Sequence, residues 1–131
     1  SGHVKPGVCD ALVCQVDMLA SFAALTGRAL AESDGPDSFN ILPTLLGAKT
    51  DPFGREYLVT QSNEPATVAL RKGSWKYVKK APRAGRKVGG ELYNLANDIG
   101  EVRNLADIEP ALLAEMAAKL AQIKNDGRSR P

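Results

Sequence analysis

Residues 109–125 carry a single apolar stripe and predict a long amphipathic helix. Large apolar side chains recur along it at helical spacing: Leu112, Leu113, Met116, Leu120 and Ile123. Pro110 suits the first turn, where a missing N–H costs nothing, and Gly127 suits the end of the helix. A helix with one apolar face has to bury that face against another element. The rest of the chain must therefore supply a surface for this helix to cover.

The polar side of the same helix contains a pair of opposite charges. Glu115 and Lys119 are four residues apart, with the acidic residue first. This order and spacing favour an ion pair on a helix surface. We therefore expect Glu115 and Lys119 to pair with each other.

Four short segments upstream of the helix are typical of β-strands. Segments 56–60, 67–71 and 75–79 are rich in β-branched and aromatic residues, and a fourth strand is expected at 91–94. The second and third are separated by Lys72, Gly73 and Ser74, and a glycine in so short a loop supplies the positive φ that a hairpin requires. The predicted fold class is α+β, an antiparallel sheet of about four strands packed against the long C-terminal helix.

The N-terminal part predicts a short strand or extended segment, a helix and a helical turn. Residues 11–13 are apolar and follow an irregular start. A helix is expected over 17–26, with Asp17 as its N-cap and Gly27 as its stop. Residues 41–46 predict a short helical turn, in which a proline is tolerated in the first turn.

Composition limits the classes of function. The chain has 131 residues, of which 44% are hydrophobic and 24% charged, so it is expected to fold around its own core. A net charge of +2 does not indicate a nucleic-acid partner. No apolar run approaches the roughly 20 residues that span a bilayer, so no membrane partner is expected.

The chain is poor in groups that carry out chemistry. Cys9 and Cys14 have neither redox nor zinc spacing, and His3 is the single histidine. A His/Cys metal cluster is therefore excluded, and a hydrolase triad is not expected. The two cysteines are interpreted as small buried apolar side chains, which leaves the redox compartment open.

The most uneven charge lies between Arg71 and Lys87, where eight basic residues occur without an acidic one: Arg71, Lys72, Lys76, Lys79, Lys80, Arg83, Arg86 and Lys87. With Trp75 and Tyr77 interleaved, the segment could bind an anionic polymer by stacking and charge. The preferred interpretation is a one-sided sheet, in which the two aromatic residues share a face and pack under the C-terminal helix while most lysines face water.

Several acidic side chains in the predicted loops could be imagined as metal ligands: Asp34, Asp37, Asp98 and Glu101, with Asn97 as a neutral oxygen donor. None has the spacing of a calcium loop. We interpret them as turn and capping residues, because Asp and Asn bond readily to nearby backbone N–H groups.

The residues from 92 onward resemble a known signature. Residues 92–95, 97–101 and 104–105 read LYNL, NDIGE and NL, which is similar to the C-terminal sulfatase signature LYDLxxDPxExxNL. Asn94 replaces the usual Asp, and Ile99 replaces the usual Pro. Three other pieces follow the order of the family: residues 2–7 resemble PGxIxxG, 17–21 resemble DLLPT, and 69–77 resemble ALRxGxWKYI.

The resemblance implies a sulfatase of the alkaline phosphatase-like superfamily, which hydrolyses a sulfate ester with a formylglycine beside a calcium ion. The formylglycine arises from a C/S-x-P-x-R motif, which this sequence does not contain. By resemblance, residues 1–50 are the end of the larger N-terminal α/β domain and 51–131 the C-terminal subdomain. We expect a C-terminal fragment with no catalytic residue, metal site or cofactor of its own, inactive when isolated.

In the family, loops of the C-terminal subdomain reach the rim of the substrate pocket. The polar segment 61–65 lies where such a loop is expected, so Gln61, Ser62 and Asn63 are the predicted substrate-binding residues. A plain connection between strands is the alternative.

Two other functions stay open at this point. The chain could be a fragment of a related phosphonate or phosphate monoester hydrolase, or an independent α+β module for anionic partners. The partners implied by the resemblance are the missing N-terminal catalytic domain and a sulfate ester. Without that domain, an apolar face formed by Leu12, Val13 and the 17–26 helix would be exposed and could support a dimer. The compartment is left open, and the resemblance is compatible with a periplasmic or secreted protein.

Overall fold

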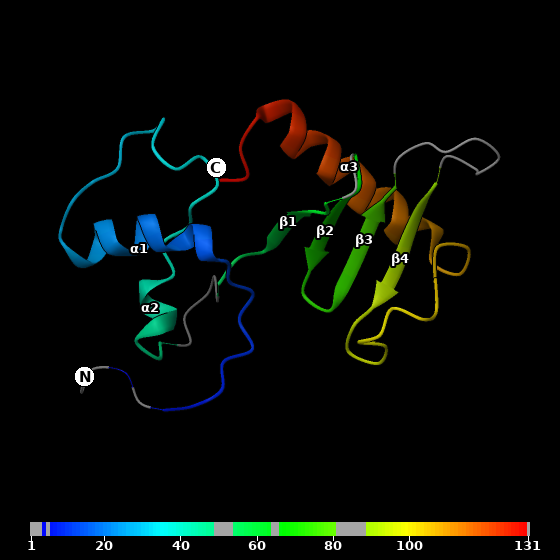
Figure 1. Cartoon of the computed structure of the whole chain (residues 1–131), viewed down its shortest axis with the longest axis horizontal. Coiled ribbons are helices and arrows are strands. Elements are labelled where there is room, and N and C mark those ends of the chain that lie inside the picture. Colours follow the sequence, from blue (N-terminus) through cyan, green and yellow to red (C-terminus); the bar gives the residue numbers. More distant parts are fainter. Residues whose placement is uncertain (1–3, 5, 49–53, 64–65, 81–88, 131) are drawn as a thin grey trace. The chain divides into compact units, whose positions relative to one another are not determined.

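The computed structural model describes residues 4, 6–48, 54–63, 66–80 and 89–130 (Figure 1). The chain divides into two compact units, with Ser1–Glu56 and Gly127–Pro131 in unit 1 and Tyr57–Asp126 in unit 2. The expected domain boundary between residues 50 and 51 stays a prediction. Across the described ranges, no helix is long and apolar enough to cross a membrane.

Unit 2 contains the predicted sheet. Its strands are β1 (Tyr57–Gln61), β2 (Val68–Lys72), β3 (Trp75–Lys79) and β4 (Gly90–Asn94), in the spatial order β1-β2-β3-β4. All three pairings are antiparallel, and Gly73 in the β2–β3 turn has φ +53°. The helix α3 (Pro110–Asp126) follows β4. The α+β class and the hairpin are therefore confirmed.

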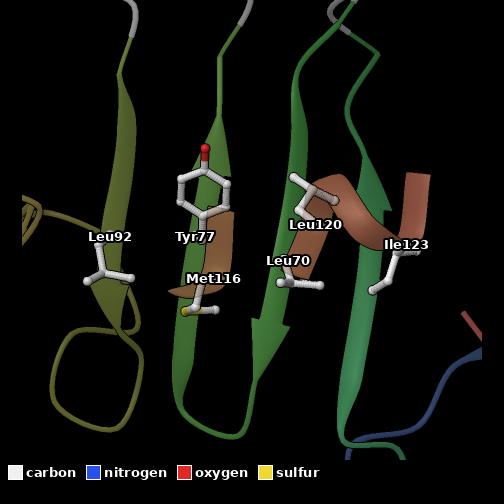
Figure 2. Packing of buried hydrophobic residues seen from close by; sticks show 6 residues of the cluster. All are labelled: Leu70, Tyr77, Leu92, Met116, Leu120 and Ile123. Carbon is white, nitrogen blue, oxygen red and sulfur yellow. The ribbon is translucent and has the colours of Figure 1, made fainter. Parts of the chain in front are cut away.

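One face of the sheet is covered by α3. Figure 2 shows three strand residues and three helix residues of the core that they share: Leu70, Tyr77, Leu92, Met116, Leu120 and Ile123. Each of them is buried, and Trp75 packs against the cluster as a partly buried neighbour. The placement of Trp75 and Tyr77 under the C-terminal helix is thus confirmed, because alternate residues of a strand share one face.

The expected ion pair within α3 is wrong. Glu115 accepts a hydrogen bond from Lys72 Nζ (2.7 Å), which raises the pKa of Lys72. The Lys119 ammonium donates to Gln122 Oε1 (3.3 Å) and lies 5.1 Å from the centre of the Tyr57 ring. A basic residue on β2 faces the helix, so Glu115 pairs across the interface and not along the helix.

Unit 1 has the two short helices that its sequence predicts. A 3-10 turn, Gln15–Asp17, leads into α1 (Met18–Leu25), and α2 spans Leu42–Leu45. Residues 11–13 form no strand, since Leu12 makes only an isolated parallel bridge to Gly54. A Cβ on Gly54 would lie 2.6 Å from the Leu12 carbonyl oxygen, and the φ of Gly54 is +79°, so this approach requires glycine.

Asp17 does not cap α1 with its side chain, contrary to expectation. Its fully buried carboxylate pairs with Arg55 Nη1 (3.0 Å) and accepts hydrogen bonds from the N–H groups of Cys14 (2.8 Å) and Phe39 (3.0 Å). The Arg55 guanidinium also lies 4.6 Å from the centre of the Phe39 ring. A buried carboxylate needs such partners to offset the cost of leaving water, and a helix cap alone would not supply them.

The residues after α3 belong to unit 1. The N–H and hydroxyl of Ser129 donate to Asp37 Oδ1 (2.8 and 2.7 Å), and the Arg130 N–H donates to Pro36 O (3.0 Å). Arg55 Nη2 donates to Ser129 Oγ at 3.1 Å. The residues 128–130 therefore hold the loop around residue 37 beside the Asp17 ion pair.

Unit 1 exposes apolar side chains along α1 and just before it. The exposed fractions are 41% for Val13, 50% for Val16 and Leu19, 57% for Phe22 and 61% for Leu25, which fits the expected apolar face. Leu12 is half-buried. The interpretation of both cysteines as buried is wrong for Cys9, which is exposed, while Cys14 is half-buried, and both are free thiols. Cys9 lies in an irregular segment that precedes the first helical turn.

Leu120→Ala tests the dependence of unit 2 on its core. Leu120 is 1% exposed, so its truncation leaves a cavity between α3 and the sheet and should lower the free energy of unfolding by about 2–5 kcal/mol. Denaturant unfolding of the 131-residue chain measures this. Ile99→Ala is the control, because Ile99 is 89% exposed and its loss should change stability little. Equal stabilities of the two variants would contradict the assigned core.

Candidate functional site

The face of the sheet opposite α3 carries a cavity of about 450 Å³, called here the open-face cavity. Thr60, Ala69, Val78 and Glu91 are consecutive cross-strand partners and form one row along its floor and wall. Side chains alternate between the two faces along a strand, and the sequence neighbours of these residues pack on the α3 side. These four residues therefore point to the opposite face. Every lining residue belongs to unit 2.

A second row adds a lysine and a tyrosine. Lys76 and Tyr93 are partners across β3 and β4, and both line the cavity. Lys76 Nζ donates to Glu101 Oε1 at 2.6 Å, and the side chains are 27% and 32% exposed. The ion pair therefore stands at the wall of the cavity, in partial contact with solvent.

A second ion pair includes a tyrosine hydroxyl. Lys80 Nζ donates to Glu91 Oε1 (2.6 Å), and the Tyr93 hydroxyl donates to Glu91 Oε2 (2.9 Å). Burial and, as the next cause, the hydrogen bond to the Glu91 carboxylate together raise the pKa of Tyr93 to about 12. Tyr93 is thus a neutral hydrogen-bond donor at ordinary pH.

The loop after β4 delivers Glu101 to this wall. Asp98 accepts hydrogen bonds from the N–H groups of Arg103 (2.8 Å) and Val102 (3.0 Å), which lower its pKa. Glu101 has φ +55°, a conformation that is costly for a residue with a Cβ. Asp98 therefore acts as the expected turn residue and orders the segment that carries Glu101.

The other acidic residues have mixed roles. Asp34 accepts the Ala31 N–H (3.1 Å), as a turn residue should. Asp37 and Glu101 are not local caps, since they bind Ser129 and Lys76 instead. Among the residues that the structure describes, no group of three His, Cys, Asp or Glu side chains could hold a metal ion.

Two of the three predicted rim residues line the open-face cavity. Gln61 is the last residue of β1, and Ser62 follows it with its N–H donating to Thr67 O (3.0 Å). Asn63 is exposed beyond them, and Glu64 and Pro65 lie outside the described residues. The structure thus brings Gln61 and Ser62 together with the two ion pairs.

The sequence analysis does not predict the charge pairs of the sheet. Most lysines of the basic segment are expected to face water, whereas Lys72, Lys76 and Lys80 each pair with a glutamate. Arg83, Arg86 and Lys87 lie outside the described residues. The alternation of side chains along β3 and β4 could have predicted that lysines and glutamates meet. It places Lys76, Val78, Glu91 and Tyr93 on one face of the sheet.

The residues of the signature have structural contacts. Asn104 Oδ1 accepts hydrogen bonds from the N–H groups of Leu92 and Ala106 (both 3.0 Å), and Leu105 N–H donates to Leu92 O (2.7 Å). Asn94 Oδ1 accepts the Ala96 N–H at 3.1 Å. The signature therefore encodes the turn that follows β4 and returns the chain to that strand.

Sequence comparisons link nearly the whole chain to known proteins. No family model matches it. An N-acetylgalactosamine-6-O-sulfatase of Bacteroides thetaiotaomicron is 38% identical over 131 residues, which is 92% of this chain and 25% of the relative. An uncharacterized sulfatase of Schizosaccharomyces pombe is 44% identical over 48 residues, or 37% of this chain and 8% of the relative. The chain thus spans about a quarter of the length of the first relative.

Solved structures agree with these sequence matches. One from a study of glycosaminoglycan metabolism by Bacteroides thetaiotaomicron has a TM-score of 0.80 and 37% identity, covering 94% of this chain and 27% of its own. A protein solved with its substrate D-glucosamine-2-N,6-O-disulfate has a TM-score of 0.63, covering 83% of this chain and 23% of its own. At 18% identity, the second shows a shared fold alone.

Tyr93 should titrate with a pKa of about 12, whereas an ordinary tyrosine has a pKa of 10.0. In Glu91→Gln the pKa should fall but stay above the ordinary value, because burial is its larger cause and persists. Ring-carbon NMR shifts followed against pH measure both values. Glu115→Gln, on the α3 side of the sheet, should leave the Tyr93 pKa unchanged. A wild-type Tyr93 that titrates at the ordinary value would contradict the buried hydroxyl.

Proposed function

This chain is the C-terminal region of a sulfatase, and we propose that the whole protein is a sulfuric ester hydrolase to which this region contributes part of the substrate pocket. The proposal rests on the 38% identity to an N-acetylgalactosamine-6-O-sulfatase along 92% of the chain. The relative's name makes a sulfated amino sugar the favoured substrate class. The role of this region is to complete the fold and to present polar groups, with no catalytic centre of its own.

The chemistry belongs to the remainder of the protein. Neither cysteine begins a C-x-P-x-R motif, and the described residues offer no set of metal ligands. The sequence therefore does not fit a formylglycine, and the described part of the chain does not fit a calcium ion. We propose that both are supplied by the N-terminal catalytic domain, which is the principal partner of this region.

The apolar face of α1 supports the same partner. Leu19, Phe22 and Leu25 are each at least half exposed. A contiguous exposed apolar face is unusual for a helix of a complete domain. We propose that the catalytic domain covers this face in the whole protein, and that a dimer through it can form in the isolated chain.

The alternative functions receive less support. A module for anionic polymers needs free cations, whereas three lysines of the basic segment are paired with glutamates. A phosphonate or phosphate monoester hydrolase shares the architecture, but both curated relatives named above are sulfatases.

Gln61, Ser62 and Asn63 are proposed to lie at the rim of the pocket. Gln61 and Ser62 line the open-face cavity, and Asn63 is exposed beside them. Amide and hydroxyl groups bind sugar hydroxyls without the desolvation cost of a full charge. Such residues select the substrate and leave bond cleavage to the catalytic domain.

The isolated 131-residue chain should not hydrolyse an aryl sulfate, with or without calcium, because it has no activated nucleophile. A chromogenic assay against a heat-denatured control measures this. Turnover that survives repurification would overturn the assignment of the chemistry to the catalytic domain.

Alanine at Gln61 or Asn63 in the full-length enzyme should raise KM for a sulfated saccharide by about 2- to 10-fold, the effect of one lost hydrogen bond. The KM for a small aryl sulfate should stay the same, because that substrate does not reach the rim. Asn125→Ala, at an exposed position of α3, is the matched control. Equal changes of KM with both substrates, or no change with either, would indicate that this loop is a plain connection between strands.

A further inference from the structure

We infer that the open-face cavity binds a neutral sugar unit, and, resting on the proposed function, that this unit is an unsulfated neighbour of the sulfated sugar in the substrate. The cavity volume of about 450 Å³ lies within the roughly 300–1,000 Å³ of small-molecule sites. The cavity is lined by residues of all four strands and of the loop after β4, so most of its wall belongs to a hydrogen-bonded sheet.

The balance of charge selects a neutral ligand. The two lysines in the cavity are each matched by a glutamate at 2.6 Å, Lys76 by Glu101 and Lys80 by Glu91. A sulfate or carboxylate would have to displace a carboxylate or accept its repulsion at close range. A neutral ligand meets neither cost.

The same pairs suit hydroxyl groups. An ammonium has three donors, and each lysine spends one on its glutamate in these ion pairs. A sugar hydroxyl both donates and accepts, so it can receive a hydrogen bond from the ammonium and give one to the partner carboxylate. Hydrogen bonds to charged groups are the stronger kind, which compensates for the solvent that a sugar loses.

Thr67 gives an independent indication of a ligand. Thr67 lines the cavity, and its buried hydroxyl oxygen has no hydrogen-bond partner within the described part of the chain. A buried hydroxyl without a partner is costly, and such groups are rare in folded proteins. A hydroxyl of a bound sugar would satisfy this oxygen.

The floor of the cavity completes the match. Ala69, Val78 and Tyr93 form an apolar cluster on this face, each 8% exposed. A pyranose has an apolar face of C–H groups and a polar edge of hydroxyls, so it fits an apolar floor inside a polar wall.

The test is a titration of the 131-residue chain, followed by amide NMR, with N-acetylgalactosamine, its 6-O-sulfate and sodium sulfate as probes. We expect the two sugars to bind with millimolar Kd values within about twofold of each other, a weak affinity that a single sugar unit can reach. Shifts should concentrate at residues of the cavity, and sulfate alone should not bind there. No saturable shift, or tighter binding of the sulfated sugar by about tenfold, would overturn the inference.

Two variants make the test specific. Thr67→Val should weaken both sugars at least about threefold while the melting temperature stays the same, because the removed hydroxyl has no partner to lose. Thr44→Val, in unit 1, is the control. Unchanged affinity in Thr67→Val would contradict the role of this hydroxyl.

The second variant changes the charge. Glu101→Gln leaves Lys76 without its carboxylate, so the variant should prefer the 6-O-sulfated sugar over the neutral one. Glu115→Gln breaks the comparable Lys72 pair on the α3 side and should leave the preference unchanged. The absence of a preference change in Glu101→Gln would overturn the argument from charge balance.

These outcomes are separable from the proposed function. Binding is measured on the chain itself, whereas the rim role is measured by KM in the full-length enzyme. Sugar binding together with an unchanged KM in Gln61→Ala would reject the rim role and keep the sugar site. No sugar binding to the chain together with a raised KM in Gln61→Ala would reject the sugar site and keep the rim role.

Discussion

The burial of one sheet face by α3 is the interaction on which the rest of unit 2 depends. The strands are short, and a four-stranded sheet has no stability without an apolar layer on one side. Leu70, Leu92 and Met116 are wholly buried between the two layers. Since alternate residues must point the other way, the opposite face is free to carry lysines, glutamates and hydroxyls. The polar cavity is therefore a direct consequence of how the core is built.

Unit 1 is organised differently, around a charge. The carboxylate of Asp17 is held by Arg55 and by two backbone N–H groups from separate segments. A single buried ion pair thus joins the start of α1, the loop at Phe39 and the segment before β1. Removing one partner would leave the other buried and unpaired, which is far more costly than losing a surface pair.

The sequence was sufficient for the elements and insufficient for the polar contacts. The apolar stripe at Leu112 to Ile123 and the Gly73 hairpin are local patterns, so the helix, the strands and their order could be predicted. The pairing of Glu115 with Lys72 joins residues 43 positions apart, and that of Asp17 with Arg55 joins residues 38 apart. No local rule gives such contacts, because they depend on which faces meet after folding. Gln61 and Ser62 came from a family resemblance, and the charges beside them became visible only with the sheet.

The return of residues 128–130 to unit 1 has a consequence for biosynthesis. Unit 2 is continuous in sequence, so all of its strands and α3 are present once residue 126 has been made. Unit 1 is discontinuous, and Ser129 and Arg130 contribute hydrogen bonds to Asp37 and Pro36 in its loop. Some of the hydrogen bonds of unit 1 therefore form only after all of unit 2 has been synthesised.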